Sequence, residues 1–180
     1  YSYLPTAVKV YNIPFIVNCN FLLDASREKI HKNRKWNEWL FQVIGYKTVE
    51  CCSEFGLKKI FTSTYLSLFR NGYHNASDTL SQKINEGLKK GFEKHPIIRN
   101  QEDELNKLFD ICFDPYDVNK ADPILCEKIA IFLKETDPNF TISAKNIIHL
   151  TDENQILTKF NPMELNDSIL QEFFASNHLK

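Results

Sequence analysis

The sequence predicts an α+β fold, in which a small β-sheet flanked by helices is followed by a second, smaller α/β unit. Short runs of β-forming residues open the chain, and similar runs return after residue 97. Between them lie long segments whose apolar residues recur every three or four positions, as on one face of a helix. A hydrophobic content of 43% over 180 residues, with 14 Phe, is enough for one sizeable domain or two small subdomains.

The first part of the chain predicts a small sheet that leads into a turn. Residues 1–4, 7–11 and 13–17 are rich in β-branched and aromatic side chains. The chain opens at Tyr1 without an initiating Met or a secretory signal. We therefore read it as a piece of a longer protein, with its first strand continuing from upstream.

A long helix is predicted after this sheet. Ser26 can act as its N-cap, with a carboxylate close behind at Glu28, and an interruption at residues 32–33 fits the pattern. Gly56 is its predicted C-cap. Its apolar stripe is more typical of core packing than of a ligand platform, and comprises Trp36, Leu40, Val43, Tyr46, Val49 and Cys52.

The middle of the chain predicts a boundary followed by a second helix. Residues 58–69 have mostly helical spacing, although their Thr and Tyr content leaves a strand open. Asn71-Gly72 is the candidate boundary, which divides the chain into residues 1–72 and 73–180. The next helix, capped by Ser77 or Asp78 and ended by His95-Pro96, is predicted to bury Leu80, Ile84, Leu88 and Phe92 and to pack closely at Gly87 and Gly91.

The rest of the chain alternates short strands and helices. Strands are predicted at residues 97–98, 108–113, 141–142 and 147–150, with an acidic turn at 102–104. A helix over residues 123–134 has Pro at its opening and apolar residues Ile124, Ile129, Ile131 and Phe132. Two closing helices are predicted over residues 151–158 and 162–175, the second capped by Asn161.

Composition excludes several classes of protein. No run of about 18 apolar residues is present, so no membrane-spanning helix is expected. The five cysteines include an adjacent pair and form no C-x-x-C, so neither a disulfide framework nor a metal site is expected. We expect these cysteines to be buried free thiols in a cytoplasmic protein. Residues 1–100 carry 15 Lys/Arg against 8 Asp/Glu, or +7, and residues 101–180 carry 7 against 15, or −8. The basic half can face phosphates or the acidic half.

Arg27 is the candidate functional residue. It is predicted to lie where a strand meets a helix, so that a fixed guanidinium points outwards and can bind a phosphate with charge and directed donors together. The alternative is an ordinary surface ion pair on a turn that is only a connection.

Residues 20–44 resemble the catalytic-loop region of the middle domain of the ninety-kilodalton heat-shock chaperones, where a leucine-rich strand leads into Ser-Arg-Glu and a long helix. The chain is similar, more closely, to sacsin-type ATPases and their bacterial relatives. In those proteins Pro-Phe-x-Val-Asn-x-Asn-Phe, Ser-Arg and Trp-Asn-x-Trp-Leu recur in this order. Here these motifs lie at residues 14–21, 26–27 and 36–40 and cover only the first quarter of the chain.

The resemblance implies a contribution to ATP hydrolysis rather than an independent activity. It implies that Arg27 stabilises charge on the γ-phosphate of ATP bound, with Mg²⁺, by an upstream domain of the same polypeptide, and that the segment relays nucleotide state. Ser26 and Glu28 would fix the loop. The chaperones have a supporting Gln four residues after the Arg, where this chain has His31. The chain itself holds only 5 Gly and none of the glycine-rich signatures of a nucleotide pocket, so no cofactor is expected within it.

A non-catalytic interaction module, with a protein client or nucleic acid as partner, is the competing interpretation. A basic cluster on the second helix and after it consists of Lys83, Lys89, Lys90, Lys94, His95 and Arg99. A solvated helix face explains that cluster more simply, because no recognised nucleic-acid motif accompanies it. The five His residues are scattered and match no nucleophile signature, so nucleophilic catalysis has little support.

Overall fold

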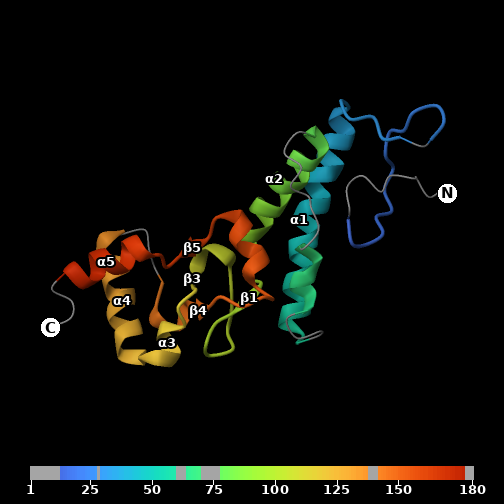
Figure 1. The fold of residues 1–180 in the computed structure, drawn as a ribbon. Coiled ribbons are helices and arrows are strands. Elements are labelled where there is room, and N and C mark those ends of the chain that lie inside the picture. Colours follow the sequence, from blue (N-terminus) through green and yellow to red (C-terminus); the bar gives the residue numbers. More distant parts are fainter. Residues whose placement is uncertain (1–12, 28, 60–63, 70–77, 138–141, 177–180) are drawn as a thin grey trace.

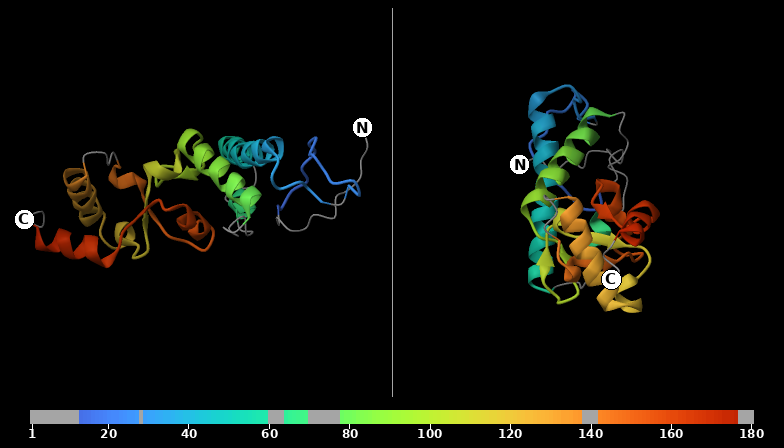
Figure 2. Two further views of the ribbon diagram at one scale, coloured as in Figure 1. Left: turned by 90° about the horizontal axis from the view of Figure 1, so that it is seen from above. Right: turned by 90° about the vertical axis from the view of Figure 1, so that its left-hand side faces the viewer.

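The computed structural model describes residues 13–27, 29–59, 64–69, 78–137 and 142–176, and its fold is α+β as predicted. The molecule is elongated, with a pair of long helices at one end and a small sheet with shorter helices at the other (Figures 1 and 2). The predicted strands at residues 1–4 and 7–11, and the boundary at residues 71–72, lie outside the described residues. The division into residues 1–72 and 73–180 therefore stays a prediction.

Helices α1 (Lys35–Leu57) and α2 (Thr79–Lys94) pack side by side at very short range (Figure 1). A Cβ atom added at Gly87 would lie 2.0 Å from the Gln42 carbonyl oxygen, and one at Gly45 would lie 2.2 Å from that of Ile84. The predicted close packing at Gly87 and Gly91 is confirmed. Gly45, which sequence reasoning did not single out, supplies the matching gap on α1.

The second helix begins and ends as predicted. Asp78 caps α2 by accepting a hydrogen bond from the backbone N–H of Ser81, and the helix ends before His95. Burial of the predicted apolar face is confirmed for all four residues, Leu80, Ile84, Leu88 and Phe92.

The first strand and parts of the first helix differ from their predictions. Residues 13–17 form no strand ladder. Helix α1 begins at Lys35, just after the predicted interruption at residues 32–33, and not at Ser26. Of the predicted apolar stripe, Leu40, Val49 and Cys52 are buried as expected, whereas Trp36 is 47% exposed. Gly56 lies inside the last turn; Lys59, at a φ of 51°, takes the left-handed position after the helix.

After α2 the chain forms a two-stranded antiparallel hairpin, β1 (Ile98–Arg99) with β2 (Leu105–Asn106). The acidic turn lies between these strands, as expected from its position. The second predicted strand was misplaced, because residues 108–110 form a 3₁₀ turn before β3 (Cys112–Asp114) begins.

A three-stranded parallel sheet has the order β4-β3-β5, with β4 at Ile147–His149 and β5 at Met163–Glu164. Helices α3 (Val118–Ala121) and α4 (Pro123–Thr136) connect β3 to β4. Parallel neighbours require such crossovers, which is why β3 pairs with strands far along the chain. The predicted strand at residues 147–150 and the helix at 123–134 are confirmed, but Ile124 and Ile131 are exposed.

The C-terminal segment differs from its prediction in detail. The predicted helix at residues 151–158 is a 3₁₀ helix at Gln155–Phe160. Residues 162–175 split into β5 and α5 (Asp167–Ala175), whose N-cap is Asn166. Asn161 instead ends the 3₁₀ helix with a φ of 55°. Asn161 and Asn166 are both suitable N-cap residues. Because residues 163–164 pair with β3 as strand β5, the helix begins after Asn166.

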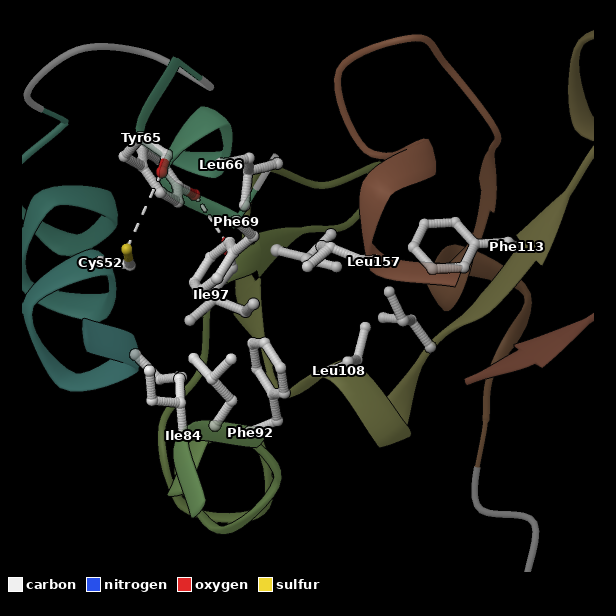
Figure 3. Close-up of a cluster of buried hydrophobic side chains, with 14 of the residues drawn as sticks. Cys52, Tyr65, Leu66, Phe69, Ile84, Phe92, Ile97, Leu108, Phe113 and Leu157 are labelled. Atoms are coloured by element: carbon white, nitrogen blue, oxygen red, sulfur yellow. Dashed lines mark hydrogen bonds between the residues drawn. The ribbon is translucent and has the colours of Figure 1, made fainter. Parts of the chain in front are cut away.

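Two apolar clusters meet at β3. The first joins α1, α2 and the hairpin region to Ile148 and Leu157 (Figure 3), and the second lies among α4, α5 and the other face of the sheet. Phe113 belongs to the first cluster and its neighbour Cys112 to the second, because successive side chains of a strand point to opposite faces. The central strand therefore holds both halves of the described structure together.

Candidate functional site

Arg27 lies on a tight turn that closes a short hairpin. The backbone N–H of Arg27 donates to the carbonyl of Asp24 at 3.0 Å, and the N–H of Asp24 donates to the carbonyl of Lys29 at 2.9 Å. Leu23 and Ile30 form an isolated antiparallel bridge below the turn. Arg27 itself has a φ of 60°, a left-handed conformation that non-glycine residues seldom adopt. The backbone presents this residue at the tip of the hairpin.

Side chains within the turn support this geometry. The Asp24 carboxylate accepts from the Ser26 hydroxyl at 2.9 Å and from the backbone N–H of Lys29 at 3.3 Å. Ser26 therefore lies in the turn and does not cap a helix; the predicted N-cap role was wrong. The N-cap position of α1 is Arg34, whose side chain makes no capping hydrogen bond. Glu28, the third predicted loop residue, lies outside the described residues.

Asn37 attaches the hairpin to α1, and sequence reasoning did not find its role. It is fully buried, and its side chain accepts from the Leu22 N–H and donates to the carbonyls of Leu22 and His31, each at 2.8 Å. The Trp36 indole N–H adds a bond of 2.7 Å to the Asn20 carbonyl. The signal was present in the Trp-Asn-x-Trp-Leu motif, where a polar residue stands between two aromatic ones.

We expect Asn37→Ala to detach the arginine hairpin from the helix. The substitution removes three hydrogen bonds and leaves backbone groups of Leu22 and His31 unpaired, a cost of about 2–4 kcal/mol from about 1 kcal/mol for each bond. Amide hydrogen exchange at residues 22–31 should then be much faster, while exchange in α2 changes little. Asn37→Asp keeps the acceptor but brings a buried carboxylate against the Leu22 and His31 carbonyls, so it should loosen the hairpin at least as much as Asn37→Ala. Unchanged protection in the hairpin of Asn37→Ala would contradict this role.

The guanidinium of Arg27 is exposed and, among the described residues, makes no ion pair or hydrogen bond. Lys29 and His31 on the same hairpin are also exposed. By contrast, Lys32 and Lys35 nearby pair with Asp78 and Glu38 at 2.8 and 3.1 Å. An unpaired guanidinium on a braced turn can bind an anion from outside with little reorganisation.

The residues of the predicted basic cluster belong to α2 and to the strand β1 that follows it. Lys89, Lys90 and Lys94 are exposed on α2, and Lys83 pairs with Glu86 at 2.7 Å. Arg99 lies on the hairpin strand β1, where it donates to the carbonyl of Gly56 and pairs with Asp103. The structure thus places Arg99 at the end of α1, engaged with local groups.

A cleft of about 510 Å³ lies between the β1–β2 hairpin and the end of β4. Its apolar part includes Leu66, Ile98 and Ile148, and its rim carries Lys59 and Arg99, both paired with Asp103. Of the residues predicted to be functional, only Arg99 lines it. The cleft and the arginine hairpin are therefore separate features.

Polar residues also gather where β3 and β4 end. The Asp114 carboxylate, 1% exposed, accepts from the backbone N–H groups of Tyr116 and Val118. His149 lies with its Nδ1 3.2 Å from the Asp114 carbonyl and 3.8 Å from the Asp117 carboxylate. The carboxyl ends of parallel strands often bear ligand sites. Here the bonds of Asp114 fix the loop after β3.

All five cysteines are free thiols, with Cys51 exposed beside the buried Cys52 on α1. Burial raises the pKa of Cys52 to about 12, and it raises those of Cys112 and Cys126 to about 12 and about 11. Because the thiolate is the reactive form, these three thiols are poor nucleophiles in the folded protein.

We expect iodoacetamide at pH 8 to alkylate Cys51 at least a hundredfold faster than its neighbour Cys52 in the native protein. The exposed Cys51 is open to the reagent, whereas the pKa of Cys52 near 12 leaves about one part in 10⁴ as thiolate. Peptide mapping of timed samples measures the extent of alkylation at both cysteines, because they lie in one peptide. Denatured protein is the control, in which both cysteines should be alkylated at equal rates. Equal native labelling would show that this part of α1 opens readily.

Comparison of the chain with models of protein families, with curated proteins and with solved structures finds no match. In the described part of the chain, no group of three or more His, Cys, Asp or Glu is placed to hold a metal ion. No helix among the same residues is long and apolar enough to cross a bilayer. The arginine hairpin therefore has to be interpreted from its own geometry and from the motifs around it.

Proposed function

We propose that this chain is a middle-type segment of a larger ATPase, in which Arg27 acts on the γ-phosphate of ATP bound by an upstream domain of the same polypeptide. The observation that carries this proposal is the exposed guanidinium at the tip of a braced hairpin, without a partner among the described residues. ATP and Mg²⁺ would be held by the upstream domain, and this chain would add one cation when the two domains close.

The chemistry of Arg27 fits that role. A phosphoryl group in transfer carries charge spread over its oxygens, and a guanidinium placed beside it stabilises that charge. The hairpin is fixed to α1 through Asn37, so the arginine is already positioned before closure. Movement at Arg27 would pass directly into the 23-residue helix α1, which supports a role in relaying nucleotide state. Since its five thiols are free, we place the protein in the cytoplasm.

The proposal is tested by replacing Arg27 in the polypeptide that contains both this chain and its nucleotide-binding domain. ATP turnover and nucleotide affinity are then measured in parallel. The chain alone is expected to show no turnover. The second candidate function is a non-catalytic interaction module, favoured by the exposed tryptophans at the start of α1. Turnover that does not depend on Arg27 would favour this second function.

A further inference from the structure

We propose that Trp36 and Trp39, with Leu22, form a docking surface for the protein domain that presents ATP to Arg27. This inference rests on the proposed function and names the surface against which the partner is held. We call these three residues the tryptophan surface. It supplies binding area beside the arginine, which by itself offers a single charged contact.

The exposure of the two tryptophans is the first observation. Trp36 is 47% exposed and Trp39 51%, and their ring centroids lie 5.2 Å apart with the planes tilted by 33°. Leu22, which is 45% exposed, is joined through its backbone to the adjacent Asn37. Tryptophan is enriched among the residues that dominate protein interfaces, because each buries roughly 150–250 Å² when covered. The pair comprises every Trp in the chain.

The connection to Arg27 is the second observation. The bonds of Trp36 to Asn20 and of Asn37 to Leu22 and His31 attach both sides of the hairpin to the first turn of α1. Arg27 lies five positions along the chain from Leu22, and that length of chain spans at most about 18 Å. A standard interface covers about 800 Å² on each partner, equivalent to a disc roughly 32 Å across. An interface of that size is wide enough to include both Arg27 and Leu22 of the tryptophan surface.

The unpaired charges indicate the chemistry of the partner. Arg27, Lys29 and Arg34 are exposed, and none forms an ion pair with a described residue, whereas Lys32 and Lys35 are paired. The complementary surface is anionic towards the hairpin, as a bound triphosphate and nearby carboxylates would make it, and apolar towards the tryptophans. The aliphatic Leu22 favours a protein over single-stranded nucleic acid, because it offers no ring face for a base to stack on.

Photo-crosslinking in the complete polypeptide tests this surface. The photo-reactive residue p-benzoylphenylalanine is placed at position 39. Trp39 makes no hydrogen bond among the described residues, whereas Trp36 is bonded to Asn20. Phe174→p-benzoylphenylalanine is the matched control, since Phe174 is also 51% exposed but lies on α5 at the other end of the molecule (Figure 1). We expect irradiation with a non-hydrolysable ATP analogue to crosslink position 39 to the nucleotide-binding domain at least tenfold more than without nucleotide. Position 174 should give no such crosslink.

The outcomes separate this inference from the proposed function. If position 39 crosslinks to nucleic acid, to a second copy or to nothing while Arg27→Ala still lowers turnover, the docking surface is wrong and the function stands. If position 39 crosslinks as expected but turnover is independent of Arg27, the proposed function fails and the interface remains. In addition, Trp39→Ala should weaken ATP-dependent docking at least tenfold while Trp39→Phe retains most of it, with nucleotide affinity unchanged in both.

Discussion

Replacing Arg27 with alanine is expected to lower ATP turnover of the complete polypeptide at least tenfold, while nucleotide affinity stays the same. Arginines that act on a transferring phosphoryl group contribute on the order of 10³–10⁵ in rate, and the effect is confined to the transition state. The exposed position of Arg27 means that its removal disturbs little of the surrounding packing. Steady-state hydrolysis and equilibrium nucleotide binding, measured on the same preparation, give the two quantities.

Two controls separate the guanidinium from the backbone. Arg27 has a φ of 60°, which strains arginine and alanine alike, whereas glycine adopts this conformation freely. Because both variants lack the guanidinium, Arg27→Gly should lose as much turnover as Arg27→Ala; recovery in the glycine variant would point to the backbone conformation of the turn. Lys90→Ala removes an exposed cation from the C-terminal half of α2 and should leave turnover within about twofold. Hydrolysis unaffected by any Arg27 substitution would remove the proposed function.

Gly87→Ala is expected to destabilise the fold strongly, although glycine to alanine in a helix interior ordinarily adds up to about 1 kcal/mol of stability. The added methyl would lie 2.0 Å from the Gln42 carbonyl oxygen and 2.9 Å from the Tyr46 nitrogen, both backbone atoms that cannot turn away. Relieving this contact forces α1 and α2 apart along their shared core. We expect a loss of about 3 kcal/mol or more and a Tm lower by about 6–12 °C.

Other glycines provide the comparison for Gly87. Gly45→Ala meets the backbone of Ile84 and Leu88 in the same contact and should destabilise the fold by a similar amount. At Gly56 the nearest atoms are the side-chain ends of Leu105 and Tyr65 at 3.1–3.3 Å, so Gly56→Ala should change Tm by less than a third as much. Thermal unfolding followed by circular dichroism measures all three variants. Equal Tm values for Gly87→Ala and Gly56→Ala would contradict the tight helix contact.

The parts of the fold that sequence predicted well are those with strong local signals. The extent of α2 follows from its Asp78 cap and apolar spacing, and the start of α4 follows from Pro123 at its opening. Residues 13–17 were mispredicted because an apolar run specifies no partner, and pairing depends on where other segments lie. The parallel order β4-β3-β5 could not be predicted, because it joins segments far apart in the chain.

At the candidate site, too, local sequence signals predicted some features, and contacts between separate segments decided the others. The predicted corner between strand and helix and the motifs around it singled out Arg27, and the structure places it on a turn with Ser26. The predicted helix start at Ser26 failed because Asp24 competes for the same local hydrogen bonds and closes a turn instead. Asn37 was missed because a polar residue among aromatic ones gives no sign of which carbonyls it will reach. Sequence spacing likewise placed Trp36 on the apolar stripe, whereas it is half-exposed and its indole N–H donates to the Asn20 carbonyl.

The position of β3 between the two apolar clusters has a consequence for synthesis of the chain. The strands that flank β3, which are β4 and β5, are translated after β3. The same holds for two residues that complete the apolar clusters, Leu157 and Phe173. On the ribosome, the earlier segments therefore emerge with apolar faces that have nothing to cover them until the last fifth of the chain is made. Nascent chains stalled shortly after α4 should accordingly engage holdase chaperones, and those stalled beyond α5 should release them.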